Sequence, residues 1–64
     1  MKKYKITLWR NDDYCSKYGT PDECCFTKEV EADSAFWACH LAVDPHVDKR
    51  NFNNKPSVYE ITEL

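Results

Sequence analysis

Six residues have side chains that commonly bind zinc, and their spacing decides whether they form a site. Structural zinc sites usually pair their ligands as Cys-x2–4-Cys or His-x3–5-His on tight turns. Here eight residues separate Cys15 from Cys24, and six separate Cys39 from His46. Neither gap is typical, so a zinc-stabilised module is only an alternative interpretation. The six residues are Cys15, Cys24, Cys25, Cys39, His40 and His46.

The four cysteines are expected to be reduced thiols. The first residues are basic, as in a secretory signal peptide, but no apolar segment follows them. We therefore expect an intracellular protein without a disulfide framework. Cys24 and Cys25 are adjacent and cannot easily bond to each other. A free cysteine often packs as a small hydrophobic residue, and we expect that role here.

Catalytic chemistry has little support in this sequence. A nucleophilic pair, such as Cys25 with His40 or His46, needs a mutual geometry that no spacing here implies. Gly19 is the only glycine, so a glycine-rich phosphate loop is missing. A chain of 64 residues also has little material for a pocket that excludes water. We therefore expect no enzymatic activity and no cofactor.

Three segments alternate between apolar and polar residues, which is typical of half-buried strands. They are residues 3–10, 24–32 and 57–64. In the first segment Tyr4, Ile6 and Leu8 share one face. Residues 11–23 are rich in Asn, Asp, Ser, Gly and Pro types and are expected to form a loop.

A helix is expected over residues 35–43. Asp33 or Ser34 can cap its N-terminus, its three alanines favour helix, and Pro45 ends it. At 100° per residue, six side chains fill one arc that can face the sheet. They are Ala35, Phe36, Ala38, Cys39, Ala42 and Val43.

The order of strand, strand, helix and strand predicts an α+β fold in a single domain, residues 1–64. The expected architecture is a ββαβ two-layer sandwich. Its three-stranded antiparallel sheet has the order 2-1-3, with the helix packed on one face. Lys3 and Lys5 support this pairing because they can meet Glu29 and Glu31 across the first two strands.

The two longest loops, residues 11–23 and 45–56, are expected side by side at one end of the sheet, where binding residues are often found. The first loop combines acidic and aromatic side chains, and Trp9 precedes it on the open sheet face. Such a surface suits a basic groove, in which it could imitate a nucleic-acid backbone. The candidate binding residues are Trp9, Asp12, Asp13, Tyr14, Tyr18, Asp22 and Glu23.

Other interpretations of this region stay open. The acids can belong to an ordinary solvated loop, or Lys49, Arg50 and Lys55 of the second loop can neutralise them. Trp9 can pack beneath the first loop, against one of its tyrosines, instead of serving as a binding anchor.

Trp37 is a further candidate binding residue. Trp37 and Leu41 fall outside the arc that faces the sheet and are spaced i, i+4. Trp37 can fold over the helix edge and shield a thin core, or it can contact a partner, since Trp is enriched at binding hot spots. The outer strands are edges that also invite pairing. A homo-oligomeric structural domain, such as a homodimer, is therefore the second hypothesis.

Charge and hydropathy argue against two classes of partner. Eleven acids against nine bases give a formal charge of −2, whereas a nucleic-acid binder usually has a positive excess. An open aromatic sheet face can stack bases, so single-strand binding is a further alternative. No apolar run approaches the ~20 residues of a membrane span, and no membrane interaction is expected.

The chain resembles the small single-domain ββαβ proteins that bacteriophages and other mobile elements encode. The resemblance rests on residues 3–8 (KYKITL), on residues 29–34 (EVEADS) before the helix, and on residues 58–61 (VYEI) in the closing strand. Many such proteins bind and block one host protein, for example a defence nuclease of the CRISPR type or a toxin. The resemblance implies a non-catalytic inhibitor in the cytoplasm of a bacterial host, with a host or defence protein as its partner.

Overall fold

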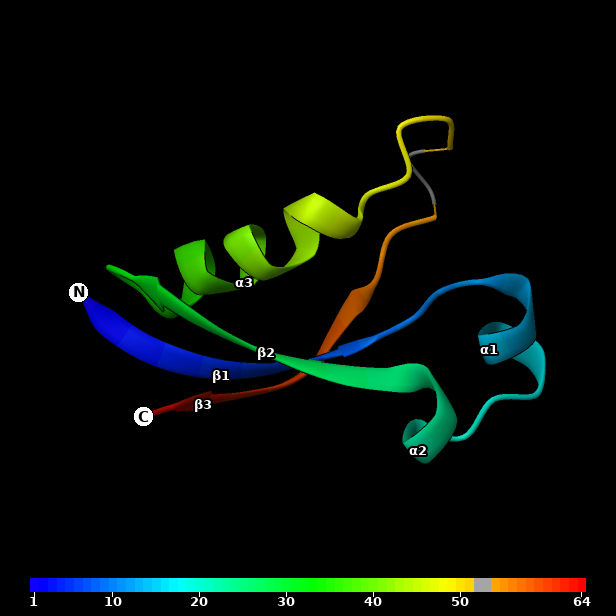
Figure 1. The fold of residues 1–64 in the computed structure, drawn as a ribbon, viewed down its shortest axis with the longest axis horizontal. Coiled ribbons are helices and arrows are strands. Elements are labelled where there is room, and N and C mark those ends of the chain that lie inside the picture. Colours follow the sequence, from blue (N-terminus) through cyan, green and yellow to red (C-terminus); the bar gives the residue numbers. More distant parts are fainter. Residues whose placement is uncertain (52–53) are drawn as a thin grey trace.

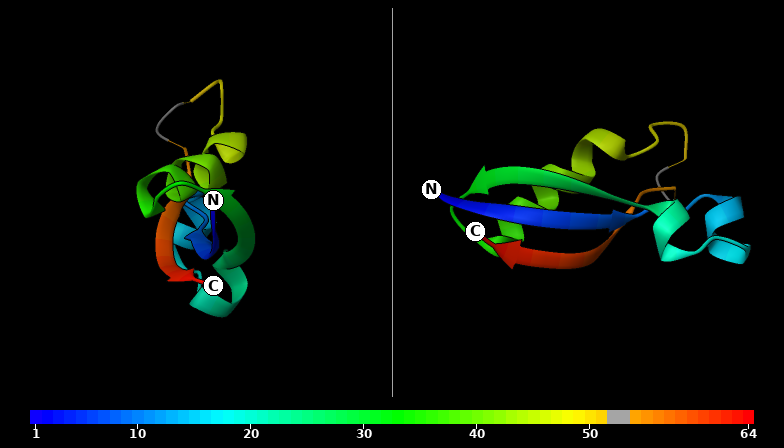
Figure 2. Two further views of the ribbon diagram at one scale, coloured as in Figure 1. Left: turned by 90° about the vertical axis from the view of Figure 1, so that its left-hand side faces the viewer. Right: turned by 60° about the horizontal axis from the view of Figure 1, so that its bottom comes forward.

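The computed structural model describes residues 1–51 and 54–64. Its three strands are β1 (Lys2–Trp9), β2 (Cys25–Ala32) and β3 (Ser57–Glu63). They form one antiparallel sheet with the order β2-β1-β3 (Figure 1). The expected strand order is therefore confirmed, and β1 lies in the middle, as both views of Figure 2 show.

Helix α3 (Ala35–Val43) lies over one face of this sheet and completes an α+β fold of two layers (Figure 1). It begins after Ser34, whose side-chain oxygen accepts a hydrogen bond from the Trp37 N–H at 3.4 Å. Of the two expected caps, Ser34 is therefore the one that is used. A short 3-10 helix, η1 (Asp44–His46), follows α3 directly and contains the proline that was expected to end the helix.

The register between β1 and β2 pairs Lys3 with Glu31 and Lys5 with Glu29. The expected opposition of charges across these strands is therefore confirmed. Lys3 also forms a diagonal ion pair with Glu29 at 3.8 Å. Both side chains are more than half exposed, so this pair adds little stability. Its main effect is to disfavour a register in which like charges would meet.

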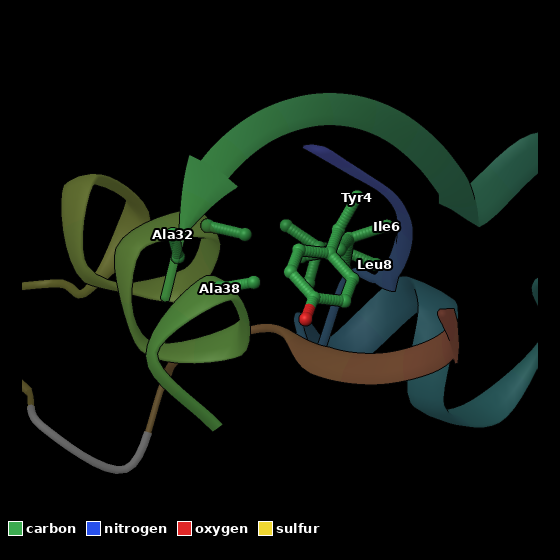
Figure 3. Close-up of a cluster of buried hydrophobic side chains, with 6 residues drawn as sticks. Tyr4, Ile6, Leu8, Ala32 and Ala38 are labelled. Carbon is green, nitrogen blue, oxygen red and sulfur yellow. The ribbon is translucent and has the colours of Figure 1, made fainter. Parts of the chain in front are cut away.

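The core lies between the middle strand and α3. Tyr4, Ile6 and Leu8 point from β1 toward the helix, and Ala38 faces them (Figure 3). Ile6, Leu8 and Ala38 are completely buried. An alanine in this position lets the helix backbone lie close to the sheet, because its side chain is a single methyl group. Among the described residues, the buried cluster is Tyr4, Ile6, Leu8, Ala32, Ala38 and Ala42.

The arc of α3 that was expected to face the sheet is partly wrong. Ala38 and Ala42 are buried, but Ala35 is exposed and Phe36 is 73% exposed. Ala35 and Phe36 belong to the first turn of the helix. At 100° per residue, Phe36 lies about 160° around the helix from Ala38 and about 120° from Ala42, so its side chain points away from the sheet that covers both alanines.

Residues 11–23, which were expected to form a loop, contain two short helices. Helix α1 (Asp13–Lys17) begins because Asp12 caps it and accepts a hydrogen bond from the Cys15 N–H at 2.8 Å. Helix α2 (Pro21–Cys24) begins with a proline, which suits the first helical position since that position needs no N–H donor. Strand β2 consequently begins at Cys25, one residue later than expected.

A disulfide joins Cys15 of α1 to Cys24 of α2, so the expectation of four reduced thiols is wrong. The two helices bring the Cα atoms to 5.7 Å from each other, which lies within the usual range for disulfides. Sequence spacing alone could not show this approach, because it depends on the two turns between the cysteines. Cys25 and Cys39 are free thiols.

The helices within residues 1–51 and 54–64 are all too short or too polar to cross a membrane.

Candidate functional site

The two short helices lie at the end of the sheet opposite both chain termini (Figures 1 and 2). We call residues 10–24, which include both helices, the tip. The tip contains four of the eleven acids and two of the nine bases of the chain. It therefore accounts for the whole formal charge of −2, since the rest of the chain has seven acids and seven bases. The negative charge is concentrated at one end of the molecule.

The disulfide holds the tip together from inside. Cys15 and Cys24 are 3% and 1% exposed, so their sulfur atoms form a small interior between α1 and α2. The tip is also connected to the sheet, because the Arg10 N–H donates a hydrogen bond to the Cys24 carbonyl at 2.9 Å. This bond extends the β1–β2 pairing by one residue pair beyond Trp9 and Cys25. It holds Arg10, the first residue of the tip, beside Cys24, the last.

Gly19 is required here for space. A Cβ atom at Gly19 would overlap the Sγ of Cys24 and lie 2.8 Å from the Cα of Cys15. Its φ angle is not positive, so backbone freedom is not the reason for the glycine. The disulfide can form behind the turn because no side chain occupies this position.

Asp12 has a structural role in the tip. Besides capping α1, its carboxylate forms an ion pair with Arg10. The hydrogen bond from the Cys15 N–H is the main cause that lowers the pKa of Asp12, and the Arg10 charge adds to it, while desolvation opposes both. With its oxygens already engaged, Asp12 positions α1 and is less available to a partner than the other acids.

The remaining acids of the tip are open to solvent. Asp13, Asp22 and Glu23 are exposed, and none of them forms an ion pair within the described part of the chain. Neutralisation by the basic residues of the second loop, the alternative interpretation, is not found among these pairs. Three carboxylates of the tip are therefore free to attract a cationic surface.

Two tyrosines add aromatic surface to the same element. Tyr14 and Tyr18 are 60% and 73% exposed, and their ring centroids lie 6.0 Å apart. They are four residues apart, which places them on one side of α1 and its C-terminal turn. Such exposed, adjacent tyrosines offer apolar contact area together with two hydroxyl groups.

Trp9 lies on the open sheet face, as expected from its alternation with Leu8, but it does not pack against the tyrosines of the tip. It is half-buried and stacks on Tyr59 of β3, with ring centroids 6.4 Å apart. A bulge in the β1–β3 pairing allows this contact. Thr7 pairs with Glu60 and Leu8 with Val58, so Tyr59 is the extra residue. Tyr59 was missing from the candidate residues because strict alternation does not predict the bulge.

Trp37 belongs to a different surface. It is 53% exposed on α3, with edge-on contacts to Phe36 and His40 at 5.5 and 5.9 Å between ring centroids. The structure thus groups the acids and tyrosines at the tip, places Trp9 beside Tyr59 on the sheet, and separates Trp37 from both by its position on the helix.

The tip and the segment before β3 lie side by side, as expected. The Asn11 side-chain amide donates hydrogen bonds to the Lys55 carbonyl at 2.6 Å and to the Ser57 hydroxyl at 2.7 Å. Between these segments is an open pocket of about 490 Å³, with Phe26 and His46 among its lining residues. Cationic and anionic side chains both line this pocket, so its charge indicates no ligand class.

The cysteines and histidines do not gather into a metal site in the described residues, where no three His, Cys, Asp or Glu side chains are suitably placed. Two of the six candidate ligands, Cys15 and Cys24, are bonded to each other. His46 instead accepts a hydrogen bond from the Lys28 ammonium at 3.1 Å and contacts the ring of Phe26.

Comparisons with protein-family models, with curated proteins and with solved structures find no match to this chain.

Proposed function

We propose that this chain is a small, non-catalytic binding module whose tip docks into a basic groove of a bacterial host or defence protein and inhibits that protein. The observation that carries the proposal is the tip itself, in which free carboxylates and exposed tyrosines share one disulfide-closed element. A groove that normally receives a nucleic-acid backbone has the complementary charge, so a nuclease is the partner class that fits best.

The charge distribution supports this choice of partner. Because the tip contains the entire net charge, the molecule approaches a basic surface with the tip first. Electrostatic steering of this kind speeds association and weakens as salt rises. Asp13, Asp22 and Glu23 are the carboxylates available for it, while Asp12 stabilises α1.

The construction of the tip supports tight binding by a small surface. Ordering a flexible loop on binding costs free energy, and a loop already closed by a disulfide avoids much of that cost. Tyrosines lose little conformational freedom and supply large contact areas, which explains their frequency in binding surfaces. Tyr14 and Tyr18 are therefore proposed as the anchors, in place of the half-buried Trp9.

The bacterial cytoplasm is part of the proposal. Disulfides are rare there because reducing systems keep thiols free. Cys15 and Cys24 are almost completely buried, which limits the access of a reductant to their sulfur atoms. Persistence of this disulfide in a reducing compartment is thus a requirement of the proposed function.

The test is affinity capture by the tagged protein from nuclease-treated lysates of bacteria that contain defence systems, followed by mass spectrometry and binding measurements on the captured protein. Combining Tyr14→Ala with Tyr18→Ala is expected to weaken binding at least tenfold, which corresponds to about 1.4 kcal/mol. Asp22→Lys is expected to weaken it further at low salt, by reversing a charge of the tip.

Glu60→Lys is the matched control, because it makes the same change of charge on β3, outside the tip. It is expected to leave binding nearly unchanged. The proposal is wrong if folded tip variants retain the same captured protein with unchanged affinity, or if the captured protein loses none of its activity when the chain binds.

A further inference from the structure

The tip has no buried interior apart from its disulfide. Within residues 10–24 only Cys15 and Cys24 are buried, and these two side chains are bonded to each other. The core of the sheet is a separate cluster, whose buried residues come from β1, β2 and α3. The two interiors share no residue. The closed form of the tip therefore depends on one covalent bond that a reductant can break.

The two helices of the tip are too short to be stable without that bond. Helices α1 and α2 have five and four residues, whereas isolated helices shorter than about 12–15 residues are marginal in water. Helix α3 packs on all three strands, but neither short helix packs comparably on any strand. Figure 1 shows both of them beyond the end of the sheet. Packing on the sheet consequently cannot replace the bridge.

Two sets of hydrogen bonds hold the ends of the tip without using the bridge. The Arg10 N–H donates to the Cys24 carbonyl at 2.9 Å. The Asn11 side chain donates to the Lys55 carbonyl and the Ser57 hydroxyl. Residues 12–23 lie between these fastened ends. Opening of the tip can therefore stay local, as a loop of residues 12–23, while β1 and β2 remain paired.

We propose that the Cys15–Cys24 bridge is a redox switch, in which reduction by a dithiol opens the tip, removes its docking surface and leaves the sheet folded. A thiolate of the dithiol attacks one sulfur of the bridge, and the other sulfur leaves as a thiolate. The second thiolate of the reductant then displaces the first cysteine. Two electrons pass to the protein, Cys15 and Cys24 each take up a proton, and the reductant becomes a disulfide.

Burial determines which reductants operate the switch. Cys15 and Cys24 are 3% and 1% exposed, so the tip must open briefly before a thiolate can reach either sulfur. A monothiol must then encounter the protein a second time to finish the exchange, whereas a dithiol finishes it within the same complex. The bridge therefore resists monothiols and yields to a dithiol. Opening separates Tyr14 from Tyr18 and disperses the carboxylates; this consequence for binding rests on the proposed function.

Limited proteolysis with trypsin tests the opening without any partner. Lys17 ends α1 in the tip, and Lys28 lies within β2. The protein is reduced with excess dithiothreitol, which is removed under nitrogen before digestion. Cleavage after Lys17 is expected to become at least tenfold faster, while cleavage after Lys28 stays within twofold of its rate in the oxidised protein. Mass spectrometry of the quenched and fully reduced peptides measures both rates.

Two double variants give matched controls with the same number of serine replacements. We call Cys15→Ser with Cys24→Ser the open variant, and Cys25→Ser with Cys39→Ser the bridged variant. The open variant should be cleaved after Lys17 at the fast rate with or without dithiothreitol. The bridged variant should respond to dithiothreitol like wild type and return to slow cleavage in excess oxidised glutathione, which re-forms the bridge and leaves reduced glutathione.

Two results of the proteolysis would overturn the switch. Cleavage after Lys17 that is as slow in reduced as in oxidised protein would show that the tip stays closed without its bridge. Equal acceleration after Lys28 would show that the bridge stabilises the whole fold instead of controlling the tip. Neither result depends on a partner, so both leave the proposed docking surface standing.

The consequence for binding is measured with the two variants as baits in the nuclease-treated lysate, so that no reductant is added to it. The bridged variant is expected to retain the protein that the wild-type chain captures, and the open variant to bind it at least tenfold more weakly. Equal retention by an open variant whose tip is cleaved rapidly would overturn both the switching of binding and the assignment of the tip as the docking surface.

Discussion

Trp9 stacks on Tyr59 across the open face of the sheet, although strict alternation along β3 would place Tyr59 on the face toward α3. The bulge in the β1–β3 pairing moves Tyr59 to the open face and leaves Val58 opposite Leu8. An otherwise exposed tryptophan is thereby half-covered. The stack thus stabilises the end of the sheet from which the tip extends.

Replacing Tyr59 by alanine is expected to lower the free energy of unfolding by about 1–2 kcal/mol, because it removes the stacked ring and exposes Trp9. Urea unfolding followed by tryptophan fluorescence measures this loss. Tyr14→Ala is the matched control, since Tyr14 is an exposed tyrosine of the tip, and it should change stability by less than about 0.5 kcal/mol. Equal losses for the two variants would show that the stack does not stabilise the fold.

Replacing Gly19 by alanine is expected to destabilise the tip, because the added methyl group overlaps the Cys24 sulfur. Overpacking of this kind typically costs about 1–3 kcal/mol. Thermal unfolding and the rate at which dithiothreitol reduces the disulfide are the measurements. Ser16→Ala, at an exposed position of α1, should change neither property. A variant as stable and as resistant to reduction as wild type would refute this role of Gly19.

Removing the disulfide by combining Cys15→Ser with Cys24→Ser is expected to lower stability by about 3 kcal/mol, on the basis of the loop-closure entropy of a bridge across nine positions. Hydrogen exchange should show that protection is lost at the tip before it is lost in β1. Cys25→Ser changes the neighbouring free thiol and should have little effect. A similar loss of stability in Cys25→Ser would show that serine substitution itself, and not removal of the disulfide, causes the loss.

The same bridge predicts how the cysteines react in living bacteria. When cells producing the protein are treated with an alkylating reagent, Cys25 and Cys39 should be modified while Cys15 and Cys24 stay protected. Mass spectrometry of the alkylated protein measures this pattern. Modification of all four cysteines would mean that the tip is not disulfide-closed in the proposed compartment.

Asp12 predicts a dependence of stability on acidic pH. Its pKa in the folded protein lies below the ordinary value of 3.8, mainly because of the hydrogen bond from the Cys15 N–H. Its ionised carboxylate therefore stabilises the fold fully above that ordinary value, and this contribution disappears as the pH falls through the lowered pKa. Unfolding should accordingly become easier as the pH falls below about 4.

Asp12→Asn tests this assignment, because asparagine keeps a side-chain oxygen that can cap α1 but does not ionise. The variant should lose less stability than wild type across the acidic range, while remaining near wild type in helix content. Identical acid unfolding curves for the two proteins would show that another carboxyl group is responsible.

The strands and their order could be predicted from the sequence because alternation and charge both depend on local spacing. Tyr4, Ile6 and Leu8 mark the buried face of β1, and the opposition of Lys5 to Glu29 sets its register with β2. These signals agree with one another, and the structure follows them. The helix was predictable for the same reason, since Ser34 and the alanines act within a few residues.

The details of the candidate site were less predictable. The acids and tyrosines of the tip were identified from composition, but the disulfide between Cys15 and Cys24 depends on how two short helices turn toward each other. Tyr59 joined Trp9 through a bulge in the β1–β3 pairing. Neither the disulfide nor the bulge follows from periodicity.

The sequence by itself therefore determined the three strands, helix α3, their order and the concentration of negative charge near one end of β1, but not the two short helices of the tip. Tertiary structure decided which cysteines bond, which aromatic side chain covers Trp9, and which face of α3 is left open. The physical reason is the distance along the chain over which each kind of interaction acts. Propensity, capping and alternation act between neighbours along the chain, whereas a disulfide, a ring stack or an exposed helix face depends on the relative positions of separate elements.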